Sequence, residues 1–195
     1  MLVGILALQG DVIEHEAALE RIGVATRRIR RVGALKGVDA LVLPGGESTT
    51  MSMLIDSSGL REELEEWVAT ERPTLGTCAG LVLMADELTD GRPDQSTLGG
   101  LGITVQRNGY GRQRFSFEAT VAAPALGDPF EAVFIRAPRI LGIDDGTAVL
   151  GRLPGTDGGP DEIVIVQRGS LIGCAFHPEL TKDDRLHERL VALAR

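Results

Sequence analysis

The residue best suited to chemistry in this sequence is Cys78, which stands in the segment GTCAGL between Gly76 and Gly80. An apolar segment ends at Thr77 and another begins at Ala79, which predicts a sharp turn between a strand and a helix. In such a turn, glycines on both sides of a nucleophile avoid clashes and leave its side chain above the sheet edge. The N–H groups that begin the helix favour a thiolate and can hold a developing oxyanion. Taken alone, a buried structural cysteine is the commoner alternative.

A nucleophilic cysteine needs a base, and the chain has three histidines. His177 ends an apolar segment and is followed by proline and Glu179. Proline favours extended backbone at the preceding residue, and residues two apart in an extended chain point the same way. His177 and Glu179 are therefore predicted to face one site, with the carboxylate orienting the imidazole. An exposed loop histidine beside a capping glutamate is an equally good interpretation. His15 and His187 fall in predicted helices and are interpreted as solvated or half-buried.

A glycine-rich turn, LPGGES at residues 43–48, follows another apolar segment. Two glycines allow a close approach of the backbone to a ligand, with an N–H group pointing into the site. Many such turns are only tight turns, but this one ends a strand that we expect to neighbour the strand before Cys78. Cys174 lies within the apolar segment before His177 and is interpreted as a core residue.

The elements that must position these residues alternate in type along the first half of the chain. Continuous apolar segments indicate strands buried on both faces, as in a parallel sheet covered by helices. Strands are predicted at residues 2–8, 24–29, 39–43 and 74–77. Helices are predicted at residues 12–22, from a cap at Ser48 or Thr49 through Ile55, at 60–69 and at 79–88. This alternation predicts a doubly wound α/β sheet.

The second half is richer in short strands separated by turn signals. They are predicted at residues 101–106, 115–121, 132–135, 148–153, 162–167 and 171–176, before a last helix at 183–194. The predicted fold class is therefore α/β, with a mostly parallel central sheet and antiparallel additions. The polar segment 90–100 is interpreted as a surface loop, and residues 1–195 as a single domain.

Composition argues against several classes of function. The 195 residues are 43% hydrophobic and carry a formal net charge of -8, which disfavours nucleic-acid and anionic-membrane partners. No apolar run is long enough for a bilayer, and the N-terminal segment is interpreted as a strand, not a signal peptide. Two cysteines are too few for a disulfide framework, which indicates a reducing cytoplasm. We expect neither a metal nor a cofactor.

The segments LPGGES, GTCAGL and FHPE, in this order, resemble the class I (triad) glutamine amidotransferases. Together with LALQGDVIEH, RNGYGRQRFSFEA and VFIRAP, they resemble the glutaminase subunits of pyridoxal 5'-phosphate synthases. The resemblance covers nearly the whole chain and implies the flavodoxin-like, three-layer fold of this class. The segment 90–100 is longer than we expect for the family.

The resemblance also implies a mechanism. Cys78 would attack the side-chain amide of L-glutamine, ammonia would leave, and water would release glutamate from a thioester. His177 would move the protons and Glu179 would orient it. Backbone N–H groups of Gly46 and Ala79 would form the oxyanion hole.

Other implied contacts concern the substrate and a partner. The implied substrate contacts are Gly46, Glu47, Ser48, Arg107, Ile135 and Arg136. Arg107 and Arg136 suit the substrate carboxylate, although surface arginines are the simpler interpretation without the motifs. The implied partner is the synthase subunit, in a large hetero-oligomeric complex that receives the ammonia. Gln9 matches a position near that interface, where contact would activate the glutaminase.

Three alternatives remain at this point. A glutaminase could serve another synthase, such as those for histidine, nucleotides or folate precursors. A cysteine peptidase or thiol-based stress protein would explain Cys78 but not the PGGES and HPE segments. A binding subunit with an inactive site would leave three competent triad residues unexplained.

Overall fold

A computed structural model describes residues 1–92, 94–109, 116–127, 129–155 and 159–195 of the chain. Its centre is a seven-stranded sheet with the order β10-β11-β12-β4-β3-β1-β2. Neighbours from β12 to β2 pair in parallel, whereas β10-β11 and β11-β12 are antiparallel. The predicted mostly parallel sheet with antiparallel additions is confirmed. Its strands are β1 (Leu2–Leu6), β2 (Ala25–Ile29), β3 (Ala40–Leu43), β4 (Thr74–Thr77), β10 (Ala148–Leu153), β11 (Glu162–Arg168) and β12 (Leu171–Cys174).

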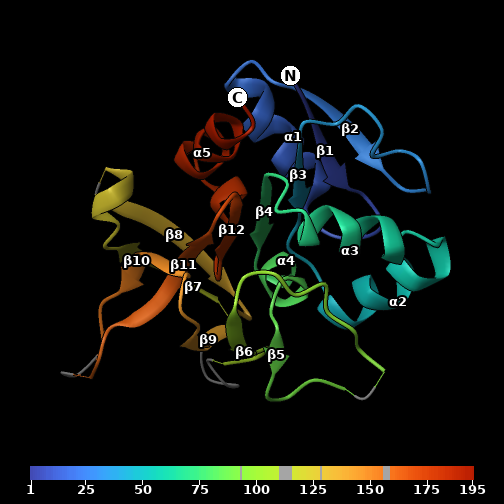
Figure 1. The fold of residues 1–195 in the computed structure, drawn as a ribbon. Coiled ribbons are helices and arrows are strands. Elements are labelled where there is room, and N and C mark those ends of the chain that lie inside the picture. Colours follow the sequence, from blue (N-terminus) through green and yellow to red (C-terminus); the bar gives the residue numbers. More distant parts are fainter. Residues whose placement is uncertain (93, 110–115, 128, 156–158) are drawn as a thin grey trace.

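Helices cover both faces of this sheet and make the three predicted layers. In Figure 1, α1 (Val12–Arg21) and α5 (Arg185–Leu193) lie on one side of the central strands. The helices α2 (Ser48–Ser58), α3 (Arg61–Ala69) and α4 (Ala79–Leu83) lie on the other side. Because both faces are covered, β3, β4 and β12 are buried along their whole lengths.

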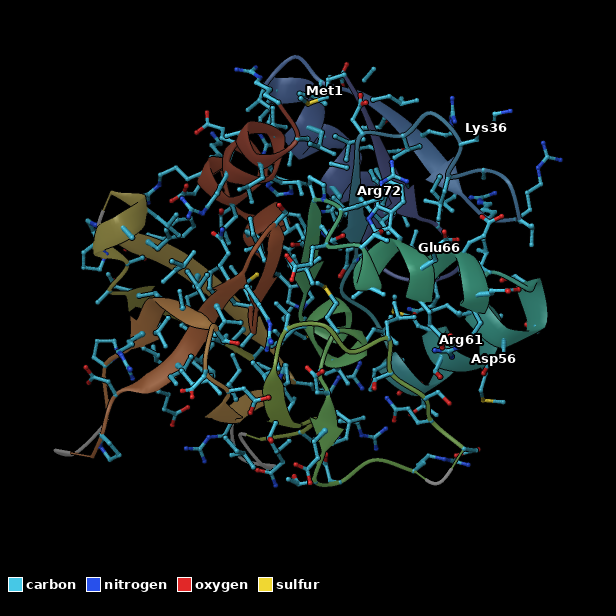
Figure 2. The ribbon with its side chains drawn as sticks, viewed as in Figure 1. Met1, Lys36, Asp56, Arg61, Glu66 and Arg72 are labelled. Atoms are coloured by element: carbon cyan, nitrogen blue, oxygen red, sulfur yellow. The ribbon has the colours of Figure 1, made fainter. Side chains whose placement is uncertain are left out.

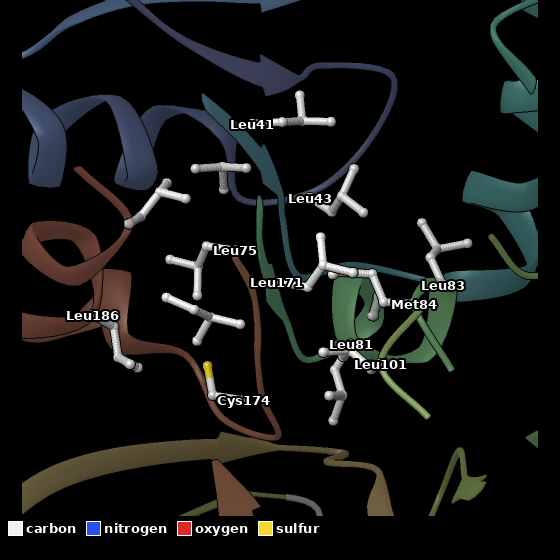
Figure 3. Close-up of a cluster of buried hydrophobic side chains, with 14 of the residues drawn as sticks. Leu41, Leu43, Leu75, Leu81, Leu83, Met84, Leu101, Leu171, Cys174 and Leu186 are labelled. Atoms are coloured by element: carbon white, nitrogen blue, oxygen red, sulfur yellow. The ribbon is translucent and has the colours of Figure 1, made fainter. Parts of the chain in front are cut away.

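The core between these layers is built largely of leucine side chains, as Figure 3 shows. Cys174 lies among them with no exposed surface, which confirms its interpretation as a core residue. Register then decides which residues meet. Thr77 pairs with Cys174 across β4 and β12, and Leu43 pairs with Gly76 across β3 and β4. The segments after these three strands therefore leave the sheet at one edge.

The region after α4 differs from the prediction of a helix through residue 88. The helix ends at Leu83, and the Asp86 carboxylate accepts hydrogen bonds from the N–H groups of Gly102 (2.5 Å) and Ile103 (3.3 Å). These contacts hold the chain in a turn, after which β5 (Glu87–Leu88) pairs with β6 (Ile103–Gln106). The strand β9 (Arg139–Ile143), which was not predicted, completes this second sheet.

A hairpin of β7 (Ser116–Val121) and β8 (Phe130–Ile135) forms the third sheet. Its β8 strand supports the segment after β12, because the His177 N–H donates to the Val133 carbonyl over 2.9 Å. Phe115, the predicted first residue of β7, lies outside the described residues, as does the rest of 110–115, the middle of the RNGYGRQRFSFEA segment. Two short 3-10 turns lie at Pro124–Leu126 and Pro178–Leu180.

Side chains tie the segment 90–100 to the helical layer. Figure 2 shows Arg61 beside Asp56, where its Nε donates over 2.7 Å. The same guanidinium donates to the Thr97 carbonyl (3.4 Å), and the Ser52 hydroxyl donates to the Ser96 carbonyl (2.9 Å). Across the part of the chain that the structure describes, no helix combines the length and apolarity needed to cross a bilayer.

Candidate active site

A cavity of about 390 Å³ opens where β1, β3, β4 and β12 end. Every predicted site residue except Glu179 lines it: Gln9, Gly46, Glu47, Ser48, Cys78, Ala79, Arg107, Ile135, Arg136 and His177. Residues that sequence reasoning did not single out also line it, namely Asp11, Val82, Asn108 and Pro138. The structure thus brings together residues from distant parts of the chain at the edge where ligands bind in open α/β sheets.

Cys78 occupies a strained turn between β4 and α4. Its backbone has φ 46° and ψ -100°, a combination that residues with side chains rarely adopt. The Cys78 N–H donates to the Cys174 carbonyl over 2.9 Å, which fixes the turn to β12. The Sγ atom lies 3.7 Å from the Ile135 carbonyl oxygen, at the cavity wall.

The two flanking glycines permit this turn because their surroundings leave no space for a side chain. A Cβ atom at Gly80 would lie 1.9 Å from the Leu43 carbonyl oxygen, and one at Gly76 would lie 2.8 Å from the Gly80 backbone. Close packing of α4 on β3 and β4 therefore explains the predicted glycine-x-cysteine-x-glycine geometry.

His177 lies beside Cys78 and is held by two carboxylates. Its Nδ1 atom is 2.8 Å from Oε1 of Glu179 and 3.2 Å from Oδ2 of Asp11. The predicted His177–Glu179 contact is present, but the extended backbone that we expected to produce it is not. Glu179 lies in the 3-10 turn Pro178–Leu180, so this turn, not an extended chain, brings the carboxylate back.

The charges around His177 favour its protonated form. Burial lowers the pKa of His177, but hydrogen bonds with Asp11, Cys78 and Glu179 outweigh it and raise that pKa to about 12. A neighbouring imidazolium is one of the environments in which cysteine thiols in general become reactive. By contrast, complete burial raises the pKa of Cys174 well above its usual value and keeps this second thiol unreactive.

The glycine turn after β3 is held by residues from the β1–α1 connection. The Glu47 N–H donates to Oε1 of Gln9 over 2.8 Å, and the Asp11 N–H donates to the Gly45 carbonyl over 3.2 Å. A Cβ atom at Gly46, where φ is 154°, would lie 2.5 Å from Oε1 of Gln9. Gln9 is therefore half-buried against the turn and is not a plain surface residue.

The Glu47 carboxylate, not Ser48 or Thr49 as predicted, caps α2. It accepts hydrogen bonds from the N–H groups of Thr49 (3.1 Å) and Thr50 (2.7 Å). Burial opposes ionisation, yet these hydrogen bonds lower the pKa of Glu47. Ser48 is therefore not the cap, and it lines the cavity.

Arg107 is positioned by hydrogen bonds instead of extending into solvent. Its Nη1 donates to Thr49 Oγ1 over 2.6 Å and to Oε1 of Gln95. Gln95 in turn donates from Nε2 to Ser48 Oγ over 3.1 Å. The segment 90–100 thus contributes Gln95 to the support of two predicted substrate contacts. Arg136, in contrast, is exposed and has a positive φ of 44° at the cavity rim.

His15 and His187 contradict the prediction that they are solvated or half-buried, because both side chains are completely buried. The cause is the packing of α1 and α5 on the same side of the sheet, against β4 and the turn that carries Glu179. Helical periodicity alone could not reveal this contact between elements far apart in sequence. For Asp11, the one available signal was its position just beyond the end of β1.

Comparison with known proteins adds independent information. A model of the SNO glutamine amidotransferase family matches residues 5–193. The chain is 49% identical to pyridoxal 5'-phosphate synthase subunit PdxT of Kineococcus radiotolerans, covering 99% of this chain and 94% of that one. It is 45% identical to the subunit of the same name from Corynebacterium jeikeium, over 100% and 97% of the two chains.

Solved structures agree with these sequence matches. A crystal structure described as a glutamine amidotransferase superposes with a TM-score of 0.89 at 42% identity, over 98% of each chain. The PurLQS structure from Thermotoga maritima superposes with a TM-score of 0.73 at 14% identity, over 100% of this chain and 98% of that one. At that identity the second likeness concerns the fold alone.

Proposed function

The chain belongs to the SNO glutamine amidotransferase family, and from this membership we propose that it is the glutaminase subunit of a pyridoxal 5'-phosphate synthase. It hydrolyses L-glutamine to L-glutamate and ammonia, and the ammonia passes to a synthase subunit. The observation that carries this proposal is the cavity that Cys78 and His177 line together while Glu179 holds His177 Nδ1 at 2.8 Å.

In the proposed mechanism, the Cys78 thiolate attacks the amide carbon of glutamine and forms a carbon–sulfur bond. The carbonyl electrons move to oxygen, where the N–H groups of Gly46 and Ala79 stabilise the charge. When the carbonyl reforms, the carbon–nitrogen bond breaks and ammonia leaves with the proton of His177. Water then attacks the thioester as His177 takes a proton from it, and glutamate and the thiolate are released.

The remaining cavity residues suit the charges of free glutamine. Arg107 and Arg136 provide cations for the α-carboxylate, and Arg107 is already oriented by Thr49 and Gln95. Glu47 and Ser48 provide acceptors for the ammonium group, and Ile135 contributes its backbone at the wall beside Cys78. These assignments follow from the family motifs and from the place of each residue in the cavity.

We also propose the setting in which this subunit works. Residues 1–195 act as one glutaminase domain in the cytoplasm, within a large hetero-oligomeric complex with the synthase subunit. Relatives named as subunits of pyridoxal 5'-phosphate synthase support this partner over synthases of histidine, nucleotides or folate precursors. Gln9, which touches the glycine turn of the proposed oxyanion hole, is the proposed link to the partner.

Replacement of the nucleophile tests the proposal. The Cys78→Ala variant should release glutamate from glutamine at least about 10³-fold more slowly, since the covalent step is lost. With the synthase subunit, this variant should form no cofactor from glutamine but should form it from an ammonium salt. The matched Cys174→Ala variant should stay active, and a diazo-ketone analogue of glutamine should label Cys78 alone. Loss of activity in Cys174→Ala with retention in Cys78→Ala would refute the mechanism.

A further inference from the structure

A buried polar cluster lies directly behind Glu179 and is not used by the mechanism above. It consists of His15 from α1, His187 from α5 and the hydroxyl of Thr77 at the end of β4, all buried. His15 Nδ1 lies 2.9 Å from His187 Nε2, and His15 Nε2 lies 3.1 Å from Thr77 Oγ1. The same His15 Nε2 atom lies 3.5 Å from Oε2 of Glu179, the oxygen that does not face His177.

Both histidines of this cluster are neutral. Burial lowers the pKa of His15 well below its usual value, and the neighbouring His187 and His177 lower it further. Burial also lowers the pKa of His187 to about 4, with Asp184 opposing and Arg21 adding to this shift. Each ring therefore carries one N–H group, and only one of the two nitrogens at the 2.9 Å contact holds a proton.

The surroundings select between the two possible proton arrangements. If His15 donated from Nδ1 to His187, its bare Nε2 would face the Glu179 carboxylate, and the N–H at His187 Nδ1 would be buried without an acceptor among the described residues. If His187 donates from Nε2 to His15 Nδ1, the N–H of His15 points toward the carboxylate and Thr77. The second arrangement places a donor beside a negative charge and strands no buried donor.

Glu179 needs such a donor. Its side chain is fully buried, and Oε2 has no hydrogen-bond partner among the residues that the structure describes, with His15 Nε2 at 3.5 Å. Burial raises the pKa of Glu179, and the hydrogen bond with His177 only partly offsets this effect. A buried carboxylate whose second oxygen meets no donor would take up a proton and release the imidazole it orients.

We propose that His15 is a positioning residue of the glutaminase reaction, which directs its Nε2–H at Oε2 of Glu179 and is itself held in that tautomer by His187. The proposal rests on the proposed glutaminase function. It makes the orientation of His177 depend on α1 and α5, which lie side by side on the face of the sheet away from α4 (Figure 1).

The tautomers can be measured directly on the unaltered chain. In a protein labelled with ¹⁵N-histidine, two-bond ¹H–¹⁵N correlations distinguish the two ring nitrogens. We expect both His15 and His187 to be protonated at Nε2 and bare at Nδ1 at neutral pH. Protonation of His15 at Nδ1 would overturn the proposal, whatever the activity of the protein.

Two substitutions at His15 test its role in the reaction, measured with the synthase subunit present. His15→Phe keeps a ring but removes the N–H. We expect kcat to fall on the order of 10- to 100-fold, the range for removing a residue that hydrogen-bonds to a ligand of a reaction centre, with little change in KM. The acid limb of the kcat/KM profile should move to higher pH, because Glu179 then takes up a proton more easily. His15→Gln, which restores an amide N–H, should recover most of kcat and the original limb.

The matched control is Leu19→Ala, which shortens a buried apolar side chain of the same helix and leaves every polar group of the cluster in place. It should lower the unfolding temperature while leaving the acid limb in place. An unmoved limb in His15→Phe, or a His15→Gln variant as impaired as His15→Phe, would refute the proposal. If the unaltered chain releases no glutamate with or without the synthase subunit, the proposed function fails, whereas the tautomer measurement still stands.

Discussion

Two carboxylates converge on a single nitrogen of His177, although a triad requires only one. Glu179 approaches Nδ1 from the buried side, and Asp11 approaches it from the cavity. Asp11 comes from the β1–α1 connection, so its position depends on an element that also holds the glycine turn. The second carboxylate further stabilises the imidazolium, whose proton on the other ring nitrogen is the one that departing ammonia must take.

Removal of the Asp11 charge should therefore narrow the pH range in which the enzyme is active, at its alkaline end. Asp11 is among the groups that raise the pKa of His177 to about 12, so Asp11→Asn should lower that pKa. The imidazolium exists below its pKa, and it would then be lost at lower pH than in the unaltered chain. The basic limb of the kcat/KM profile for glutamine should accordingly move to lower pH.

The charge-matched control for this experiment is Asp145→Asn, in an exposed turn after β9. It removes the same charge far from the cavity and should leave the limb where it is. A basic limb that does not move in Asp11→Asn would show that Glu179 and Cys78 alone set the proton affinity of His177.

The residues of the proposed triad could be singled out from the sequence because each is marked by its immediate neighbours. Glycines flank Cys78, and a proline separates His177 from Glu179. The buried His15–His187 pair could not be predicted, since its members are 172 positions apart and meet only through the packing of two helices. Residue patterns report local geometry, and contacts of this kind are decided by the tertiary fold.

The segment 90–100 supports the cavity because it places Gln95 against Ser48 and Arg107, which line that cavity. It is bound to α2 through the Ser96 carbonyl and to α3 through the Thr97 carbonyl, and Gln95 bridges Ser48 and Arg107. The segment therefore acts as a brace for the guanidinium that we assign to the substrate carboxylate.

Loss of that brace should weaken substrate binding more than chemistry. Gln95→Ala removes one of two acceptors from the Arg107 guanidinium, and hydrogen bonds to charged groups contribute about 1.5–3 kcal/mol. Because Thr49 remains, we expect KM for glutamine to rise about tenfold, the lower end of that range, with little change in kcat. Steady-state kinetics would measure both, with Asp94→Ala as a control in the same segment. A lower kcat with an unchanged KM would contradict this role.

Prediction succeeded for elements with one dominant pattern and failed where side-chain contacts intervene. The strands 74–77 and 148–153 have the predicted bounds, since continuous apolar runs and turn signals define them. The helix predicted through residue 88 stops early because the Asp86 carboxylate binds backbone N–H groups from residues 100–103. The hydrophobic periodicity of residues 79–88 cannot reveal this contact with residues distant in the sequence.

At the scale of the whole molecule, the cavity opens at a sheet edge where a second chain can reach it. Gln9 lies at this edge, and its side chain already holds the Glu47 N–H of the glycine turn. The turn contains Gly45 and Gly46, whose shared peptide has no side chains to fix it and is held by the hydrogen bond from the Asp11 N–H to the Gly45 carbonyl. Contact with the synthase subunit near Gln9 would select the orientation that aims the Gly46 N–H at the oxyanion.

Gln9→Ala should accordingly lower glutaminase activity stimulated by the synthase on the order of 10- to 1000-fold, the range for one missing oxyanion donor. Basal activity of the isolated chain should change little. Glutamate release measured with and without the synthase subunit checks both expectations, and Gln9→Glu, which retains an acceptor for the Glu47 N–H, separates this contact from others. Equal loss in both assays would place Gln9 in the chemistry itself.

The backbone of Cys78 has a further consequence for the stability of the chain. At φ 46° a side chain is strained by roughly 1–3 kcal/mol, and glycine escapes that strain. Cys78→Gly should therefore unfold at higher denaturant concentration than Cys78→Ala, by about 1 kcal/mol in the free energy of unfolding. At Cys174, which has no such backbone, the order of the glycine and alanine variants should be reversed.

At residue 78, the side chain that the proposed reaction requires therefore lowers the stability of the fold. Selection for resistance to heat alone would favour glycine at residue 78 and would leave an intact fold with no thiol. A laboratory evolution experiment that rewards only folding should lose the enzyme through this substitution, and one that also rewards ammonia release should retain the strained cysteine and stabilise the chain elsewhere.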